Sequence, residues 1–262
     1  AYSYLLFHTV TELITISIAF AIALLVWNSR EFIENDYLKV IGIGYAACAC
    51  LDLIHTLAYK GMNIFPGYGA NLATQLWIAA RYLQAATLIA APLAYGRGPG
   101  NIAIVGGYAL ITPLLAAAVF TGVFPECYRE GSGLTLFKIV SEYVIVALII
   151  ISIFLLRRIR SSFAVGTYRL LAASSVCAAC AEIAFTAYIG VYDFANVAGH
   201  LLKLASFYCI CRAIIITGIR DPFSVVFREL KQTEDSLLAT RESIEQQVRD
   251  RTAELVWARD IL

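Results

Sequence analysis

The segment LTLFKIVSEYVIVALIIISIFLL, which covers residues 134–156, contains only two charged residues, Lys138 and Glu142. An α-helix needs about 20 predominantly apolar residues to cross a hydrocarbon core about 30 Å thick, so this segment is long enough to span a membrane. Six further segments share its length and apolar character, at residues 3–27, 37–59, 71–95, 101–121, 167–190 and 194–217. The sequence therefore predicts an all-α protein in which residues 1–222 form a seven-transmembrane helix bundle.

The composition agrees with a membrane protein. Of the 262 residues, 60% are hydrophobic and 15% are charged, whereas soluble domains carry about 25% charged residues. The formal net charge of +1 gives no reason to expect a nucleic-acid partner, and no cleavable signal peptide is visible. Six of the seven cysteines lie inside the apolar segments, where cysteine acts as a small hydrophobic residue. We expect the lipid bilayer as a partner and no disulfide framework.

The basic residues are unevenly distributed between the loops, and cytoplasmic loops of membrane proteins are enriched in Lys and Arg. A cytoplasmic C-terminus leaves little more than Lys60 and Arg129 on the outer side. The inner side then holds Arg30, Lys39, Arg97, Arg157, Arg158, Arg160, Arg169 and Arg220. We therefore expect the N-terminus outside and the C-terminus in the cytoplasm.

The character of the chain changes after Asp221-Pro222, and residues 223–262 are expected to form a separate cytoplasmic unit. This region is charged, and its apolar residues recur every seven positions in two registers offset by four. The registers are Leu230, Leu237 and Ile244, then Val248, Leu255 and Leu262. The pattern favours a long helix in a parallel dimeric coiled coil with a stutter, hence a homodimer, over a solvated amphipathic helix. It continues to residue 262 without a stop signal, so we expect a downstream output domain.

Ionisable residues cost free energy inside a bilayer and usually have partners or a task there. In this chain polar residues occur in pairs three or four positions apart, which places both side chains on one helix face. The pairs are His8–Glu12, Asp52–His55, Trp77–Arg81, Lys138–Glu142 and His200–Lys203, and segment 167–190 adds Glu182. Counted along the helices, they share a slab about 6–15 Å below the expected outer surface. Segment 101–121 has no charge and is expected at the periphery, facing lipid or a dimer partner.

The simplest interpretation of this polar layer is a structural network of ion pairs, because four carboxylates face three cations. Such a network does not explain why all three histidines of the chain lie in the layer. Imidazole binds Zn, Cu and Fe, and a carboxylate either ligates the metal or orients the imidazole. We therefore predict a transition-metal site with His8, His55 and His200 as ligands. Further ligands or orienting groups are expected among Glu12, Asp52, Glu142 and Glu182.

Three other occupants of the layer stay open. Two of the histidines could instead hold a haem as axial ligands. A lysine midway through the seventh span, Lys203, resembles the attachment point in retinal proteins, but no acid follows Arg81 to serve as a counterion, so retinal is disfavoured. A small organic or anionic ligand could be bound by Trp77, Arg81, Lys138, Lys203, Tyr59, Tyr143 and Tyr188.

Several runs of residues carry a family resemblance. They are FHTVTE at 7–12, LDLIHTLAYKGM at 51–62, NLATQLWIAARY at 71–82 and HLLK at 200–203. The membrane part of the chain therefore resembles the bacterial membrane-associated sensor domain of the third MASE type. The run VRDRTAEL at 248–255 is similar to signalling helices that connect sensors to PAS, histidine kinase or diguanylate cyclase modules. The resemblance implies the input half of a signalling protein in the bacterial inner (cytoplasmic) membrane, and it does not supply the stimulus.

These features together predict a sensory input domain, with a two-component sensor histidine kinase as the first expectation for the full protein and a diguanylate cyclase as the second. Occupancy of the outer polar site is expected to shift helix packing and to reach the output domain through the seventh span. The chain carries no phosphoacceptor motif or nucleotide-binding glycine run, so it is not expected to be an enzyme by itself. The alternative is an integral membrane metalloenzyme or haem protein that uses the same layer.

Overall fold

The computed structural model describes residues 2–30, 35–186, 194–217, 230–238, 240–248 and 251, with side chains from Tyr4 onward. The chain divides into two compact units, Ala1–Gly218 and Ile219–Leu262.

The described residues of the first unit form seven long helices and one small hairpin. The helices are α1 (Tyr2–Asn28), α2 (Asp36–Leu57), α3 (Ala70–Ala94), α4 (Asn101–Phe120), α5 (Leu136–Arg158), α6 (Val165–Thr186) and α7 (Phe194–Ile215). Strands β1 (Tyr128–Arg129) and β2 (Gly133–Leu134) pair antiparallel before α5, and the short 3-10 helix η1 (Arg160–Ser162) follows it. All seven long helices are apolar enough to cross a membrane, which confirms the prediction of an all-α bundle with seven spans.

The ends of the helices follow ordinary capping chemistry. At the start of α5 the Thr135 hydroxyl accepts a hydrogen bond from the Lys138 backbone N–H, which satisfies one of the free donors of the first turn. At the start of α2 the Asn35 side chain does the same for the N–H of Tyr37. Arg157 and Arg158 lie in the last turn of α5, where positive charge is favourable. These caps help to fix where α2 and α5 begin.

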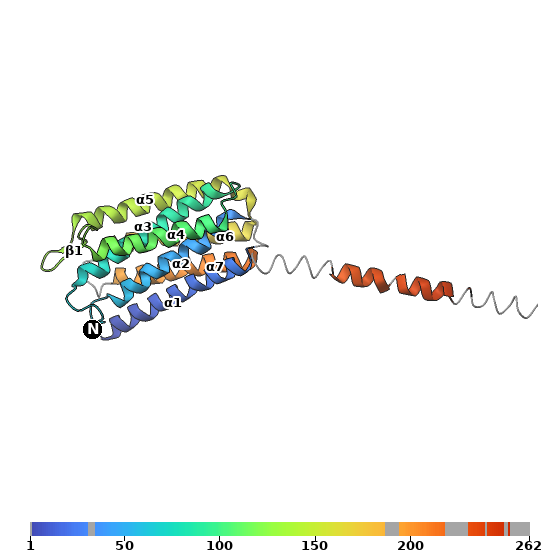
Figure 1. Ribbon diagram of the computed structural model, residues 1–262, viewed down its shortest axis with the longest axis horizontal. Helices are drawn as coiled ribbons and strands as arrows, with labels where there is room; N and C mark the ends of the chain where they lie inside the picture. Colours follow the sequence, from blue (N-terminus) through green and yellow to red (C-terminus); the bar gives the residue numbers. More distant parts are fainter. Residues whose placement is uncertain are drawn as a thin grey trace, which may run out of the picture. The chain divides into compact units, whose positions relative to one another are not determined.

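Six of the helices form a closed ring. α1, α2, α3, α5, α6 and α7 each pack against the next in this order, and α7 packs back against α1. Figure 1 shows these helices lying side by side in one bundle. α4 lies outside this ring, where it packs against α2 and α3. Only Ile104 and Val119 of α4 are buried, which confirms its expected place at the periphery. The six ring helices are the six that carry the polar layer.

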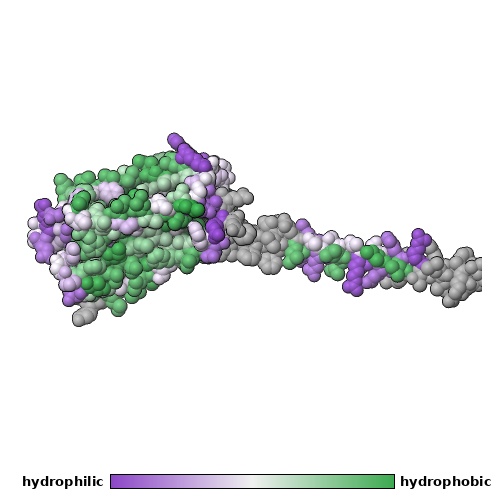
Figure 2. Space-filling model, viewed as in Figure 1, coloured by the Kyte–Doolittle hydropathy of each residue, from purple (hydrophilic) through white to green (hydrophobic). Residues whose placement is uncertain are grey.

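The flank of the bundle is apolar. Figure 2 shows green hydrophobic side chains over this flank and purple hydrophilic ones at the two ends of the bundle. Leu24, Ile102 and Leu114 point outward with 65%, 87% and 58% of their surface exposed. Large apolar side chains with this exposure would be unfavourable in water, and they match contact with lipid tails.

At Gly44 helix α2 packs closely against its neighbours. A Cβ atom at this position would lie 2.4 Å from Thr87 Cγ2 on α3 and 2.8 Å from the Tyr108 hydroxyl on α4. We expect Gly44→Ala to lower the free energy of unfolding by about 1–3 kcal/mol, because the packed neighbours must move. Thermal unfolding in lipid nanodiscs measures this effect.

Gly106→Ala in α4 is the matched control for Gly44→Ala. A Cβ atom at Gly106 meets nothing within 4 Å. The substitution is expected to be neutral or stabilising by up to about 1 kcal/mol, because alanine is the better helix former. Equal melting temperatures for the two variants would contradict the tight packing at Gly44.

The second unit is helical over residues 230–238 and 240–248. Its heptad residues Leu230, Leu237 and Ile244 are 61%, 65% and 54% exposed in the single chain. Leu255 and Leu262, which were expected to continue the pattern, lie outside the described residues. The helix is therefore present over its described part, and the dimeric coiled coil stays a prediction.

Candidate functional site

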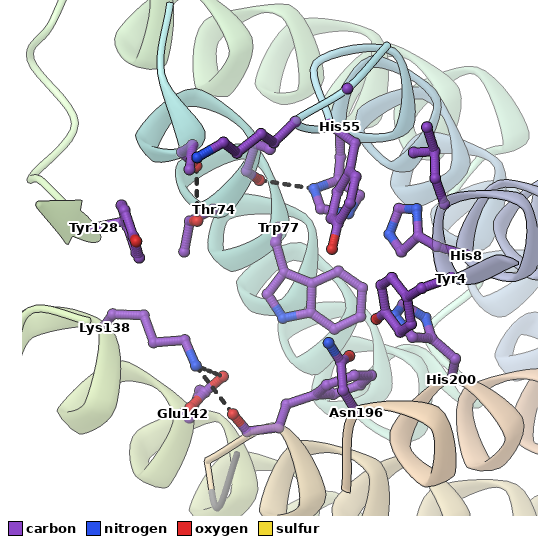
Figure 3. A pocket seen from close by; sticks show the side chains of 17 residues that line it. Tyr4, His8, His55, Thr74, Trp77, Tyr128, Lys138, Glu142, Asn196 and His200 are labelled. Atoms are coloured by element: carbon purple, nitrogen blue, oxygen red, sulfur yellow. Dashed lines mark hydrogen bonds and ion pairs between the residues drawn. The ribbon is translucent and has the colours of Figure 1, made fainter. Parts of the chain in front are cut away.

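A cavity opens at the end of the bundle where α1 begins. Its volume is about 590 Å³, which is within the range of small-molecule sites. Figure 3 shows side chains from all six ring helices and from β1 around it. The residues labelled there are Tyr4, His8, His55, Thr74, Trp77, Tyr128, Lys138, Glu142, Asn196 and His200.

The three histidines form a cluster on one side of this cavity. The ring centroid of His8 lies 4.9 Å from that of His200 and 5.5 Å from that of His55. His8 also stacks on Tyr59, with centroids 3.8 Å apart. The rings come from α1, α2 and α7, so residues far apart in sequence meet at one point. All three rings are almost fully buried.

Hydrogen bonds fix the tautomers of two of these rings. The Nδ1 atom of His55 lies 2.7 Å from the Ala73 carbonyl oxygen, which can only accept, so Nδ1 carries the proton. The Nε2 atom of the neutral His55 ring then carries a lone pair, and it has no hydrogen-bond partner among the described residues. His200 Nδ1 donates in the same way to Glu12 Oε1 over 3.0 Å. Both rings therefore present Nε2 as an acceptor or a metal ligand.

A group of potential metal ligands lies at this point. His8, Glu12 and His200 each offer one ligand atom, and these three atoms lie within 4.8 Å of one another. All three residues are buried. The Nδ1 atom of His8 has no hydrogen-bond partner among the described residues. This group of two imidazoles and a carboxylate could hold a metal ion.

A buried ion network lies next to the histidine cluster. Lys203 Nζ contacts Glu12 Oε2 at 2.7 Å and Asp52 Oδ2 at 3.0 Å. Nη2 of Arg81 donates to both carboxylate oxygens of Asp52, each over 2.7 Å. Gln84 accepts a further hydrogen bond from Arg81 and donates one to the Tyr45 hydroxyl. The two carboxylates and two cations balance each other, and they connect α1, α2, α3 and α7.

Trp77 connects the cavity with this network. Its indole lines the cavity between the histidines on one side and Lys138 and Glu142 on the other (Figure 3). Arg81 Cζ and Lys203 Nζ lie 4.7 Å and 4.6 Å from the ring centroid, in cation–π geometry. Trp77 therefore contacts the cavity and two cations of the network at once.

A second ion pair lies across the cavity from the histidines. Lys138 Nζ is 2.6 Å from Glu142 Oε1, and it donates a hydrogen bond to the Phe185 carbonyl oxygen over 3.0 Å. Both side chains are buried, and both line the cavity. This pair ties α5 to the end of α6 and leaves the wall on that side with balanced charge.

The loop before α5 supplies one wall of the cavity. The Asn71 side chain accepts hydrogen bonds from the backbone N–H groups of Cys127 and Tyr128, over 2.9 Å and 3.0 Å. These bonds hold β1 against α3 and bring Tyr128 to the cavity. Burial raises the pKa of the Cys127 thiol to about 12.

The structure brings half of the fourteen predicted site residues to the cavity wall. These are His8, His55, Tyr59, Trp77, Lys138, Glu142 and His200. Four others are buried but do not line it, because they are engaged in or near the ion network. These are Glu12, Asp52, Arg81 and Lys203. Glu182 is buried on α6 and is also absent from the wall, so direct ligation by Asp52 or Glu182 is not supported.

One predicted ligand-binding residue is misplaced. Tyr143 is 60% exposed and lies on the outer face of α5. It follows Glu142 directly, and neighbouring residues of a helix point about 100° apart, so only one of the two can face the cavity. Tyr188 lies outside the described residues.

Sequence reasoning missed several residues of the cavity wall. Tyr4 precedes His8 by four positions, and Asn196 precedes His200 by four, so helical spacing could have found both. Thr74 precedes Trp77 by three positions, so the same helical spacing could have found it. Tyr128 gave no such signal, because it reaches the cavity through a hairpin between helices.

Comparison with known proteins agrees with this membrane architecture. A family model described as a membrane-associated sensor domain, MASE3, matches residues 1–222. No curated protein and no solved structure matches the chain. The family match covers all seven helices and the whole cavity, and the chain therefore belongs to the MASE3 family of membrane-associated sensor domains.

Proposed function

We propose that this sensor domain detects its stimulus through a Zn, Cu or Fe ion held by His8, His55 and His200. The chain is a membrane sensory input domain by family and by its seven apolar helices. The observation that carries the metal proposal is the convergence of three buried imidazoles from α1, α2 and α7, two of them with Nδ1 already bonded to an acceptor. This arrangement is typical of metal-binding histidines, whose second nitrogen is held by a carbonyl or carboxylate.

The spacing of the rings supports one ion rather than a haem. Two imidazoles on a tetrahedral metal, with metal–nitrogen distances of about 2.0–2.1 Å, have centroids about 5 Å apart. The separations of 4.9 Å and 5.5 Å around His8 agree with this value. Axial ligands of a haem lie about 6 Å apart, with the macrocycle between them. The T-shaped contacts of His8 with His55 and with His200 therefore favour a single ion over a haem in this proposal.

Glu12 supports the metal site as an orienting group in this proposal. Both of its oxygens are engaged, Oε1 by His200 Nδ1 and Oε2 by Lys203 Nζ. A carboxylate in this position holds the imidazole in place and raises its basicity. Three histidine ligands then leave a fourth position for water or an exogenous ligand, as in metal sites that react with small molecules.

The proposed route to the output passes through α7. His200 belongs to the metal site and Lys203 to the ion network, and the two lie on one face of α7. Metal binding, or a redox change of the bound metal, would alter the contacts of Lys203 with Glu12 and Asp52. The packing of α7 against α1 and α2 would change as a result. We place the cavity on the outer side of a bacterial inner membrane, and we infer that residues 223–262 pass the shift through a dimeric coiled coil to a histidine kinase or another output domain.

Metal analysis of the purified chain in nanodiscs tests the proposal. We expect one Zn, Cu or Fe per chain after reconstitution, with loss on chelation and recovery on metal addition. Substitution by Co²⁺ should give d–d absorption bands of a tetrahedral site. A protein that stays metal-free in the presence of all three metals would overturn the proposal. A Soret band in the absorption spectrum would show that the bound group is a haem and not a single metal ion.

A further inference from the structure

The cavity is much larger than a metal ion requires. Its volume of about 590 Å³ matches that of drug-sized ligands, whereas one water occupies about 30 Å³ of liquid. The histidine cluster occupies one side, and Trp77 separates it from the side formed by Lys138 and Glu142 (Figure 3). The remaining space therefore suits an organic molecule beside the metal site.

The walls of this space are aromatic. Tyr59, Trp77, Tyr128 and Phe185 line it together with the histidine rings. Phe185 contacts Trp77 edge to face, with centroids 4.7 Å apart, and so fixes the plane of the indole. Rings in stacked or edge-to-face contact favour a flat aromatic partner over a flexible chain.

The charged residues that line the cavity indicate which charge a ligand would carry. Among the described lining residues the charged ones are Lys60, Lys138 and Glu142, so cations exceed carboxylates by one. Lys60 is exposed in the α2–α3 connection, at the side where the cavity meets the surface. A metal ion on the histidines would add further positive charge. An anionic group is therefore favoured inside the cavity, and an amine is disfavoured.

We propose that the cavity binds a small aromatic carboxylate. This inference deepens the proposed function, because it names the class of ligand for the same sensory cavity. It does not require the metal to be present, since aromatic walls and excess cation both exist without it. A metal on His8, His55 and His200 would strengthen binding through its open fourth position.

Fluorine NMR of the full chain in nanodiscs tests the proposal with four probes. They are 4-fluorobenzoate, 4-fluorobenzylamine, 4-fluorobenzyl alcohol and trifluoroacetate, measured in chelator-treated and in Zn²⁺-loaded protein. We expect 4-fluorobenzoate to bind at least about tenfold more tightly than the amine, the alcohol or the ringless anion, because only it combines ring and charge. Equal or tighter binding of any of the other three, or no binding of 4-fluorobenzoate, would overturn the inference.

Two variants of one ion pair locate the binding. Lys138→Met removes a wall cation and is expected to weaken 4-fluorobenzoate binding about tenfold, whereas Glu142→Gln removes the wall anion and is expected to tighten it several-fold. Both variants break the same 2.6 Å contact, so a folding defect would weaken binding in both. Weaker binding in both, or no change in either, would contradict the assignment.

A third variant and the metal state separate the remaining outcomes. Lys39→Met removes a cation near the start of α2, about 24 Å along the helix from His55, and should leave binding unchanged. Carboxylate binding by metal-free protein that never loads metal would sustain this inference and overturn the metal proposal. Metal loading without carboxylate binding would do the reverse.

Discussion

Replacement of His55 by alanine is expected to weaken metal binding by more than about 100-fold while the helix bundle stays folded, because changes to groups that merely orient a metal ligand already cost 10–100-fold. His55 is the most informative of the three histidines. Its only hydrogen bond among the described residues is the one from Nδ1 to the Ala73 carbonyl, so its removal breaks no ion pair. Metal titration followed by Co²⁺ absorption measures the loss.

Tyr59→Phe is the matched control for this variant. Tyr59 lines the same cavity and stacks on His8, and phenylalanine keeps that stack. Metal affinity within about threefold of the unmodified chain is expected for Tyr59→Phe, because no ligand is lost. Retention of full affinity by His55→Ala would remove His55 from the ligand set and favour instead His8, Glu12 and His200, whose ligand atoms lie within 4.8 Å of one another.

Replacement of Lys203 by methionine is expected to have the largest effect on stability. Lys203 is buried and joins Glu12 to Asp52, so its loss leaves one uncompensated negative charge inside the bundle. Removal of one partner from a buried ion pair costs about 3–5 kcal/mol, which is a large part of the stability of most domains. Thermal or denaturant unfolding in nanodiscs is the measurement.

Two further variants separate lost charge balance from lost packing. Glu12→Gln combined with Lys203→Met restores neutrality and should recover part of the lost stability. Lys39→Met breaks a partly exposed pair with Asp36, whose Nζ–Oδ1 distance is 3.6 Å, and should cost less than about 1 kcal/mol. A Lys203→Met variant as stable as Lys39→Met would show that the network does not hold the helices together.

The spans and the polar layer could be predicted from the sequence because both depend on local patterns. Apolar length sets a span, and the three- or four-residue spacing places His8 with Glu12, or His200 with Lys203, on one helix face. Depth counted from the helix ends brought these residues to a common level, and in the structure most of them lie at the cavity or in the ion network.

The contacts between residues of different helices could not be predicted in the same way. The depth of Lys203 in the bundle can be counted from the sequence. The rotation of α7 relative to α1 and α2 cannot be counted in this way, and this rotation is what lets Lys203 bridge Glu12 and Asp52. The rotation of α5 was unknown in the same way. Tyr143 lies at the expected depth, but its side chain is exposed and points away from the cavity. Tyr128 depends on a hairpin held by Asn71, a contact between residues more than fifty positions apart.

The closure of the ring between α1 and α7 has a consequence for synthesis of the protein. Glu12 emerges from the ribosome 191 residues before Lys203, its partner at 2.7 Å. Helix α1 therefore enters the membrane with a carboxylate whose cation has not been translated, and one charged residue at the centre of a membrane helix costs about 2.5–3.5 kcal/mol on insertion scales. The last helix to be made completes the neutral network. Assembly of the ion network is thus complete only after α7 has been translated.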